Sequence, residues 1–203
     1  MIRKFILPLA LNIVALTTMA QQNVDAQINR IREAYAARLK MMENQPSGEE
    51  HKVEQMTISY SRNYPGTGLQ ECTTTFYWTD EEDEMYMLKP TLYFVTSQNS
   101  LNFGLYRFSR EYLLDAVTEE PLFMLASTQL GDDGERQEYR FYFDHGHLIK
   151  QVPEQIVTRD GADTLAPDIS LDANGRAVEA ALIAEFNIIK ENFHNNIATF
   201  TWQ

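Results

Sequence analysis

Two stretches of the chain carry apolar residues at the three- and four-residue spacing of an amphipathic helix. The first covers Asn23–Gln45, and its apolar stripe consists of Val24, Ile28, Ile31, Tyr35, Leu39 and Met42. The second covers Arg176–Asn195, with an apolar stripe that includes Val178, Leu182, Phe186, Ile189 and Phe193. Charged side chains fall outside both stripes. The pattern predicts a helix toward each end of the chain, each with one face to bury.

Between these helices, short runs of β-prone residues alternate between apolar and polar positions and are separated by turn formers. The predicted strands are Met56–Ser61, Cys72–Trp78, Thr91–Thr96, Gly104–Leu114, Leu122–Gln129, Gln137–Phe143 and Leu148–Val152. Short connectors such as Asp144-His145-Gly146 are typical of hairpins. The chain is therefore predicted to be α+β, an antiparallel meander of about seven strands with both helices packed on it. We expect the two stripes on one sheet face, or wrapped by a strongly curved sheet.

The segment Pro153–Asn174 is rich in turn-forming residues and is predicted to be a loop. Its last residues, Asp172-Ala173-Asn174, precede Gly175 and fit two structures equally well. They form either the turn of one more hairpin or the start of the second helix.

The N-terminus has the composition of an export signal. Arg3 and Lys4 precede the apolar segment Phe5–Leu16, and Thr18-Met19-Ala20 supplies small residues for cleavage. The apolar segment is shorter than the roughly twenty residues that span a membrane. The only cysteine, Cys72, does not follow the cleavage point, so no lipid anchor is expected. Residues 1–20 are predicted to be a signal peptide and 21–203 a single domain, periplasmic or secreted, without a stable membrane anchor.

The net charge limits the classes of binding partner, and the cysteine content limits disulfide formation. The formal net charge of −12 repels phosphate backbones and anionic lipid surfaces, so nucleic acid is not expected as a partner. A single cysteine cannot form an intrachain disulfide. Cys72 is interpreted as a small core residue, with a reactive thiol as the alternative.

Sequence motifs of common enzyme classes are missing. The chain has no nucleophile elbow, phosphate-binding loop, zinc-protease helix or dinucleotide fingerprint. The sequence therefore favours a non-enzymatic role, with no catalytic residue and no cofactor predicted. The exception is Asp144, His145 and His147, where two imidazoles and a carboxylate could form a zinc or copper site. A tight hairpin turn explains the same residues.

Two further groups of side chains suggest ligands. Arginines beside tyrosines on predicted strands can line an anion or sugar site, which makes Tyr106, Arg107, Arg140 and Tyr142 candidate ligand-binding residues. Exposed cross-strand ion pairs explain these arginines equally well. An irregular calcium loop between residues 160 and 174 is a second metal hypothesis, supported by Asp160, Asp163, Asp168, Asp172 and Asn174.

The glutamine-led segment after the signal, the short helix and the hairpin Glu138–Ile149 together resemble uncharacterised exported proteins of Bacteroides-type bacteria. This resemblance is one of style and names no motif. It implies a location in a Gram-negative envelope and transfers no catalytic residue.

The leading hypothesis is a non-enzymatic envelope domain that binds a protein, a glycan or an apolar ligand through an aromatic sheet surface. One alternative is a periplasmic carrier that holds an apolar ligand between a curved sheet and the helices. Another is a metal-assisted hydrolase centred on His145 and His147. A role in assembly through the two amphipathic helices is the third.

Overall fold

The computed structural model describes residues 6–43, 54–82, 88–131, 134, 136–157, 163–165 and 173–200. Its helices are α1 (Ile6–Glu43) and α2 (Ala173–Phe200). Its strands are β1 (Glu54–Tyr64), β2 (Gly68–Glu82), β3 (Leu88–Leu101), β4 (Tyr106–Leu114), β5 (Pro121–Leu130), β6 (Arg136–Asp144), β7 (His147–Val157) and β8 (Asp163–Leu165).

The eight strands form one antiparallel sheet whose spatial order is the order of the sequence. This confirms the predicted α+β meander with a helix at each end. The additional strand is β8, three residues that pair with the outer side of β7. The second helix begins at Ala173, so Ala173-Asn174-Gly175 start a helix and do not form a hairpin turn.

The predicted tight turn between β6 and β7 is also confirmed. Asp144 pairs with His147 across the hairpin. The two residues between them, His145 and Gly146, have φ angles of 49° and 74°. Positive φ at both central positions matches the twist of the flanking strands and is least strained for glycine.

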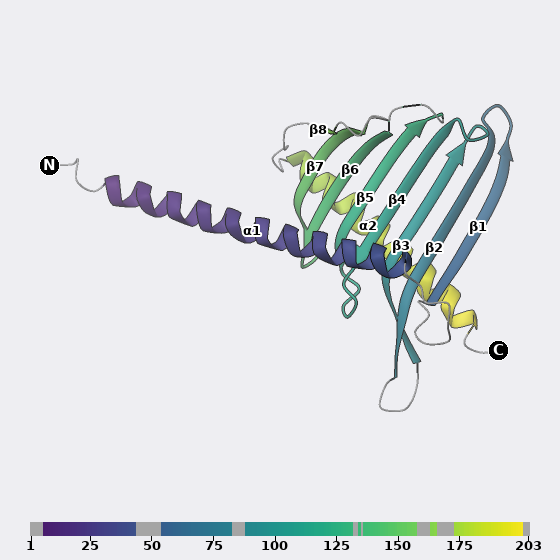
Figure 1. The fold of residues 1–203 in the computed structure, drawn as a ribbon, viewed down its shortest axis with the longest axis horizontal. Helices are drawn as coiled ribbons and strands as arrows, with labels where there is room; N and C mark the ends of the chain where they lie inside the picture. Colours follow the sequence, from purple (N-terminus) through teal and green to yellow (C-terminus); the bar gives the residue numbers. More distant parts are fainter. Residues whose placement is uncertain are drawn as a thin grey trace.

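The two helices lie on opposite faces of the sheet (Figure 1). The stripe of α1 packs with Leu113 and Phe123, whereas that of α2 packs with Tyr112 and Phe143. The expectation of a shared face or an enclosing curved sheet is therefore wrong. Successive strand residues point to opposite faces of the sheet, so a run of consecutive apolar residues places apolar side chains on both faces. Each helix buries the apolar side chains of one face.

A bulge in β3 strengthens the packing beneath α1. Tyr77 pairs with Phe94 and Trp78 with Leu92, which leaves Tyr93 without a partner in the register. A bulge lets two neighbouring residues share a face. Tyr93 and Phe94 accordingly both belong to the apolar cluster that α1 covers.

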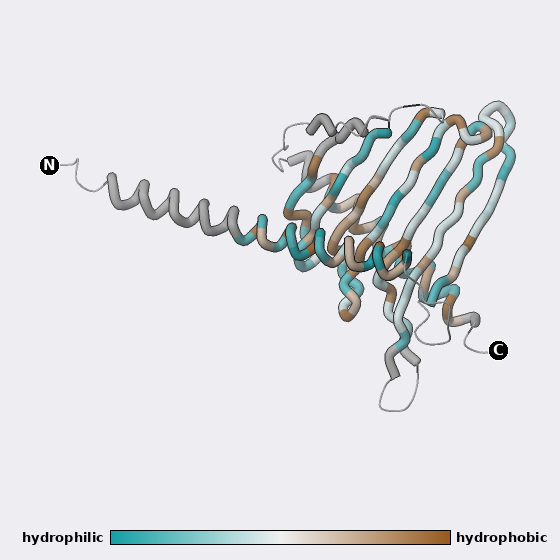
Figure 2. Tube along the Cα trace, viewed as in Figure 1, coloured by the Kyte–Doolittle hydropathy of each residue, from teal (hydrophilic) through white to brown (hydrophobic). Residues whose placement is uncertain are grey.

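Apolar side chains from six strands pack against α2. Phe186 makes edge-to-face contacts with Tyr112 and Phe143, each with ring centroids 5.4 Å apart. Phe193 lies 5.5 Å from the ring of Trp78. Figure 2 shows that hydrophobic positions gather on the central strands, while β1 and β2 are mostly neutral or hydrophilic. The main core thus lies between α2 and the centre of the sheet.

The backbone of α1 begins at Ile6, so this helix contains most of the residues predicted to form the export signal. Neither α1 nor α2, over the residues described, is both long and apolar enough to cross a membrane. Export and cleavage near Ala20 stay predictions.

Candidate functional site

The sheet face that carries α1 changes from apolar to polar along the strands. The register aligns its side chains in rows across the sheet. The row beneath α1 is Tyr77, Phe94, Leu113, Phe123 and Tyr142. Two rows further on, the members are Thr73, Gln98, Ser109, Ser127 and Glu138. The row after that is Glu71, Ser100, Arg107, Gln129 and Arg136. Both of these distant rows are entirely polar.

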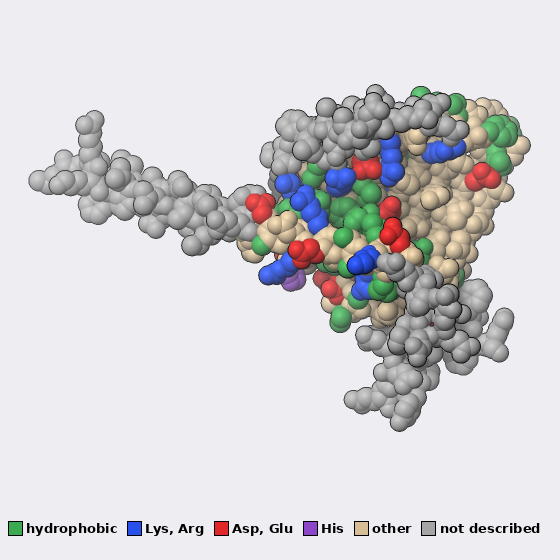
Figure 3. Space-filling model, in the orientation of Figure 1, with side chains coloured by type: hydrophobic (Ala, Val, Ile, Leu, Met, Phe, Trp, Pro, Cys, Tyr) green, Lys and Arg blue, Asp and Glu red, His purple; other side chains and the backbone are tan. Residues whose placement is uncertain are grey.

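These two rows line a hollow of about 490 Å³, which we call the polar trough. Its side-chain lining is Glu71, Thr73, Gln98, Ser100, Arg107, Ser109, Ser127, Gln129 and Arg136. Helix α1 packs against β5 and β6 over the apolar row and does not reach these positions. Figure 3 shows this face, with hydrophobic side chains gathered beside α1 and mostly uncharged surface over the outer strands.

Hydroxyl groups form the floor of the trough. The hydroxyls of Ser109 and Ser127 lie 2.6 Å apart, and Ser127 is buried. A further pair, Ser59 and Thr73, lies at 3.1 Å on the outer strands. Each hydroxyl can both donate and accept. The floor is therefore able to bind a ligand that presents either kind of group.

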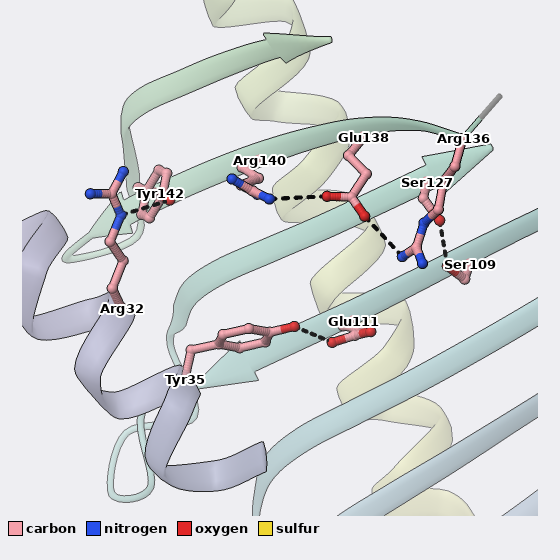
Figure 4. A network of polar contacts seen from close by, with 9 residues as sticks. All are labelled: Arg32, Tyr35, Ser109, Glu111, Ser127, Arg136, Glu138, Arg140 and Tyr142. Atoms are coloured by element: carbon pink, nitrogen blue, oxygen red, sulfur yellow. Dashed lines mark hydrogen bonds and ion pairs between the residues drawn. The ribbon is translucent and has the colours of Figure 1, made fainter. Parts of the chain in front are cut away.

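A buried carboxylate joins two arginines at the side of the trough (Figure 4). Glu138 is 8% exposed. One of its oxygens lies 3.0 Å from Nη2 of Arg136, and the other lies 3.0 Å from Nη2 of Arg140. The Nε of Arg136 is buried and has no hydrogen-bond partner among the residues described. A buried donor without an acceptor costs on the order of 1–3 kcal/mol, so this nitrogen favours an incoming acceptor.

Beyond Glu138, a smaller hollow of about 370 Å³ lies against α1. Tyr35 on α1 donates its hydroxyl to Glu111, and Arg32 donates its Nε to the hydroxyl of Tyr142 at 3.3 Å. Burial, followed by the hydrogen bond to Glu111, raises the pKa of Tyr35 well above its usual value. Tyr35 therefore stays a neutral donor and attaches α1 to the polar part of the sheet.

Three of the four predicted ligand residues lie on this face. Arg107 lines the polar trough, and Arg140 and Tyr142 line the smaller hollow. Tyr106 lies on the opposite face, where it lines a separate hollow with Phe108. Neighbouring strand residues alternate, so Tyr106 and Arg107 cannot share a face in a regular strand. The other aromatic positions of β6 are covered by the helices and belong to the core.

The predicted metal ligands contact different side chains. His145 lies 3.0 Å from its neighbour Asp144, which also accepts a hydrogen bond from Gln27 on α1. His147 lies 3.1 Å from Glu179 on α2. Within the described part of the chain, no group of three or more histidine, cysteine or acidic side chains could hold a metal ion. Most of the predicted calcium loop, including Asp160, Asp168 and Asp172, lies outside the described residues.

A further hollow, of about 470 Å³, lies between α2 and the outer strands on the opposite face. We call it the α2 groove, and its apolar lining includes Ile58, Tyr60, Phe76, Ile188 and Ile189. The half-buried Cys72 also lines it. At one end Glu185 contacts Arg110 and Tyr112.

Most of the trough was not predicted from the sequence. Gln98, Ser109, Ser127 and Arg136 were not singled out, because polar residues at alternate positions are ordinary on a solvent-facing strand. The alternation of polar and apolar residues is visible within each strand. Only the pairing register between strands shows that these four residues lie in adjacent rows.

The chain was compared with protein-family models, with curated proteins and with solved structures, and none of the three comparisons gave a match.

Proposed function

We propose that this chain is an exported, non-enzymatic domain of the bacterial envelope that binds a short acidic glycan in the polar trough. The observation that carries the proposal is the pair of adjacent polar rows lying in a hollow that α1 leaves uncovered. The predicted signal over residues 1–20 supports export, and the resemblance to envelope proteins supports the location.

The chemistry of the trough suits a sugar. Sugar hydroxyls donate and accept hydrogen bonds, and the lining supplies both functions through the amides of Gln98 and Gln129 and the hydroxyls of Ser100 and Ser109. The volume of about 490 Å³ lies within the size range of small-molecule sites.

Two arginines suggest that the sugar is acidic. Arg107 and Arg136 line the trough together with one carboxylate, Glu71, and Arg136 is also paired with Glu138, in a chain whose formal net charge is −12. The arginine fork binds carboxylates through paired hydrogen bonds, and a carboxylate oxygen would supply the acceptor that Arg136 Nε lacks among the described residues. The negative charge of the whole chain repels long polyanions, which favours a short ligand.

The same residues favour binding over catalysis. Ser109 and Ser127 are the natural nucleophiles of the trough, yet their hydroxyls bond to each other. A serine nucleophile requires a base within hydrogen-bond reach. No histidine is among the described residues that line the hollow.

Isothermal titration calorimetry of the mature chain with trigalacturonate tests the proposal, with maltotriose as the neutral control. We expect binding of the acidic sugar and a rise in Kd of about tenfold in Arg136→Gln, because a charged hydrogen-bond donor is lost. The matched control is Arg30→Gln, on an exposed position of α1 outside the trough. Equal binding of the two sugars, no binding of either, or an unchanged Kd in Arg136→Gln would contradict the proposal.

The α2 groove supports a second candidate function, that of a carrier for an apolar ligand. Its isoleucines and aromatic side chains offer an apolar surface beside α2. A fluorescent probe such as N-phenyl-1-naphthylamine should bind there, and Ile189→Asp should abolish its fluorescence gain. Unchanged fluorescence in this variant would remove the carrier hypothesis.

A further inference from the structure

Strand β1 forms one edge of the sheet. Its eleven residues pair with β2 on one side, and no strand described in the structure pairs with the other side. The opposite edge is the three-residue β8. A long edge strand exposes a row of backbone donors and acceptors that can pair with another chain.

Natural proteins usually protect such an edge with proline, lysine, a bulge or a very short strand. Strand β1 has none of these. Its sequence is EQMTISYSRNY, and its register with β2 runs without interruption from Glu54 to Tyr64. The charged residues in it are Glu54 and Arg62. Within the described part of the chain, this edge is therefore long and regular and carries none of these protections.

The side of β1 that faces the α2 groove is complementary to itself. The residues on it are, in order, Glu54, Met56, Ile58, Tyr60 and Arg62. In an antiparallel pair with a second copy centred on Ile58, that residue meets its own counterpart, Met56 meets Tyr60 and Glu54 meets Arg62. Cross-strand pairs of apolar residues and of opposite charges stabilise a sheet. Symmetric registers centred on residues 57, 59 or 60 do not bring Glu54 opposite Arg62.

We propose that β1 pairs antiparallel with β1 of a second copy of this chain, centred on Ile58, so that one sheet runs through a two-fold dimer. The pairing covers apolar surface that the single chain leaves open, since Ile58 is 36% and Tyr60 is 52% exposed. It forms two Glu54–Arg62 ion pairs, one at each end. Charge complementarity to its own sequence selects a second copy as the partner. The proposal does not depend on the sugar-binding function.

Sedimentation equilibrium of the mature chain tests the proposal. The wild type should associate to a dimer, and Glu54→Arg or Arg62→Glu should each raise the dimer Kd about tenfold, because both ion pairs become like-charge contacts. An equimolar mixture of the two variants should form a heterodimer, and the double variant should recover the wild-type Kd. Glu33→Arg, on an exposed position of α1, is the matched control and should leave the Kd unchanged.

A second measurement fixes the register. In a Cys72→Ala background, Ile58→Cys should give a disulfide-linked dimer on mild oxidation, whereas Arg62→Cys should not. A wild-type monomer at all concentrations overturns the proposal, as does a dimer that neither charge reversal weakens. Cross-linking at residue 62 but not at residue 58 overturns the register. Far-UV circular dichroism of each variant shows that a loss of dimer is not a loss of fold.

Discussion

The two faces of the sheet are built differently although the same strands form both. The face beneath α2 buries apolar side chains from β2 to β7, among them Phe76, Met124 and Leu148, and carries Thr74, Ser97 and Arg110 toward the α2 groove. The face beneath α1 is apolar only in the strip that the helix covers and becomes polar where the helix does not reach.

The two faces therefore contribute differently to the stability of the fold and to the binding of a ligand. Burial of a large apolar side chain stabilises a fold by roughly 1.5–3 kcal/mol, whereas a polar side chain such as Ser127 contributes little once hydration is lost. The α2 face is therefore the main source of stability. The polar half of the α1 face can present hydrogen-bonding groups because little of the apolar core lies in it.

The strongest test of this comparison is Phe186→Ala on the α2 face. Phe186 is fully buried between Tyr112 and Phe143, so its removal should lower the free energy of unfolding by about 4 kcal/mol. Urea denaturation measures the change. Ile188→Ala, at a side chain that is 59% exposed on the same helix, should cost less than about 1 kcal/mol. Similar losses in the two variants would show that α2 is not the main support of the core.

The corresponding substitution on the α1 face is Ile31→Ala. Ile31 is buried in the smaller apolar cluster, and its truncation should cost about 3 kcal/mol. The same urea titration gives the value, with Asn29→Ala as an exposed control. A loss larger than that in Phe186→Ala would reverse the order of the two faces.

Within the polar half of the α1 face, Glu138 is the residue with the largest structural effect. Its carboxylate holds two arginines, so Glu138→Ala should destabilise the chain by about 2 kcal/mol. Glu71→Ala, on the same face but exposed, should change stability by less than about 0.5 kcal/mol. If thermal unfolding shows no difference between the two variants, the arginine pairs do not support the fold.

The smallest expected effect lies in the turn between β4 and β5, outside both faces. Asp115 accepts backbone hydrogen bonds from Thr118 and Val117, each at 2.9 Å, and these hold its pKa below the usual value, Thr118 contributing most. A depressed pKa stabilises the fold above about pH 4, and the effect is lost as the pH falls through the folded-state pKa. Asp115→Asn should therefore cost about 1 kcal/mol at neutral pH and progressively less as the pH falls through the folded-state pKa. An equal cost at neutral pH and below the folded-state pKa would contradict this assignment.

The sequence predicted the type and order of the elements because each of these depends on local spacing. The stripe of Ile28 and Ile31 and that of Phe186 and Phe193 each indicate a helix with one buried face. A stripe does not say which side of a sheet it covers. The apolar triplet Tyr112-Leu113-Leu114 carried that information, because it requires burial on both faces.

The candidate site was predictable only in part. Arg107 and Arg140 were singled out because they stand beside tyrosines on predicted strands, and of the two only Arg107 lines the polar trough. Grouping Tyr106 with Arg107 ignored the alternation of strand side chains. Ser127 and Gln98 belong to different strands, separated in the sequence by all of β4. Their alignment depends on two successive registers, which turn lengths and bulges determine and composition does not.

The meander order of the sheet suggests an order in which the elements fold. Each of the described strands pairs with the one before it, so the sheet can form by closing short loops in succession, with little entropy lost at each step. Helix α2 is different, because its contact from His194 to Glu119 and its packing on Trp78 join distant parts of the sequence. The apolar α2 face therefore stays open to water and to other chains until this helix docks. Synthesis that stops before residue 173 would leave that surface permanently uncovered and prone to aggregate.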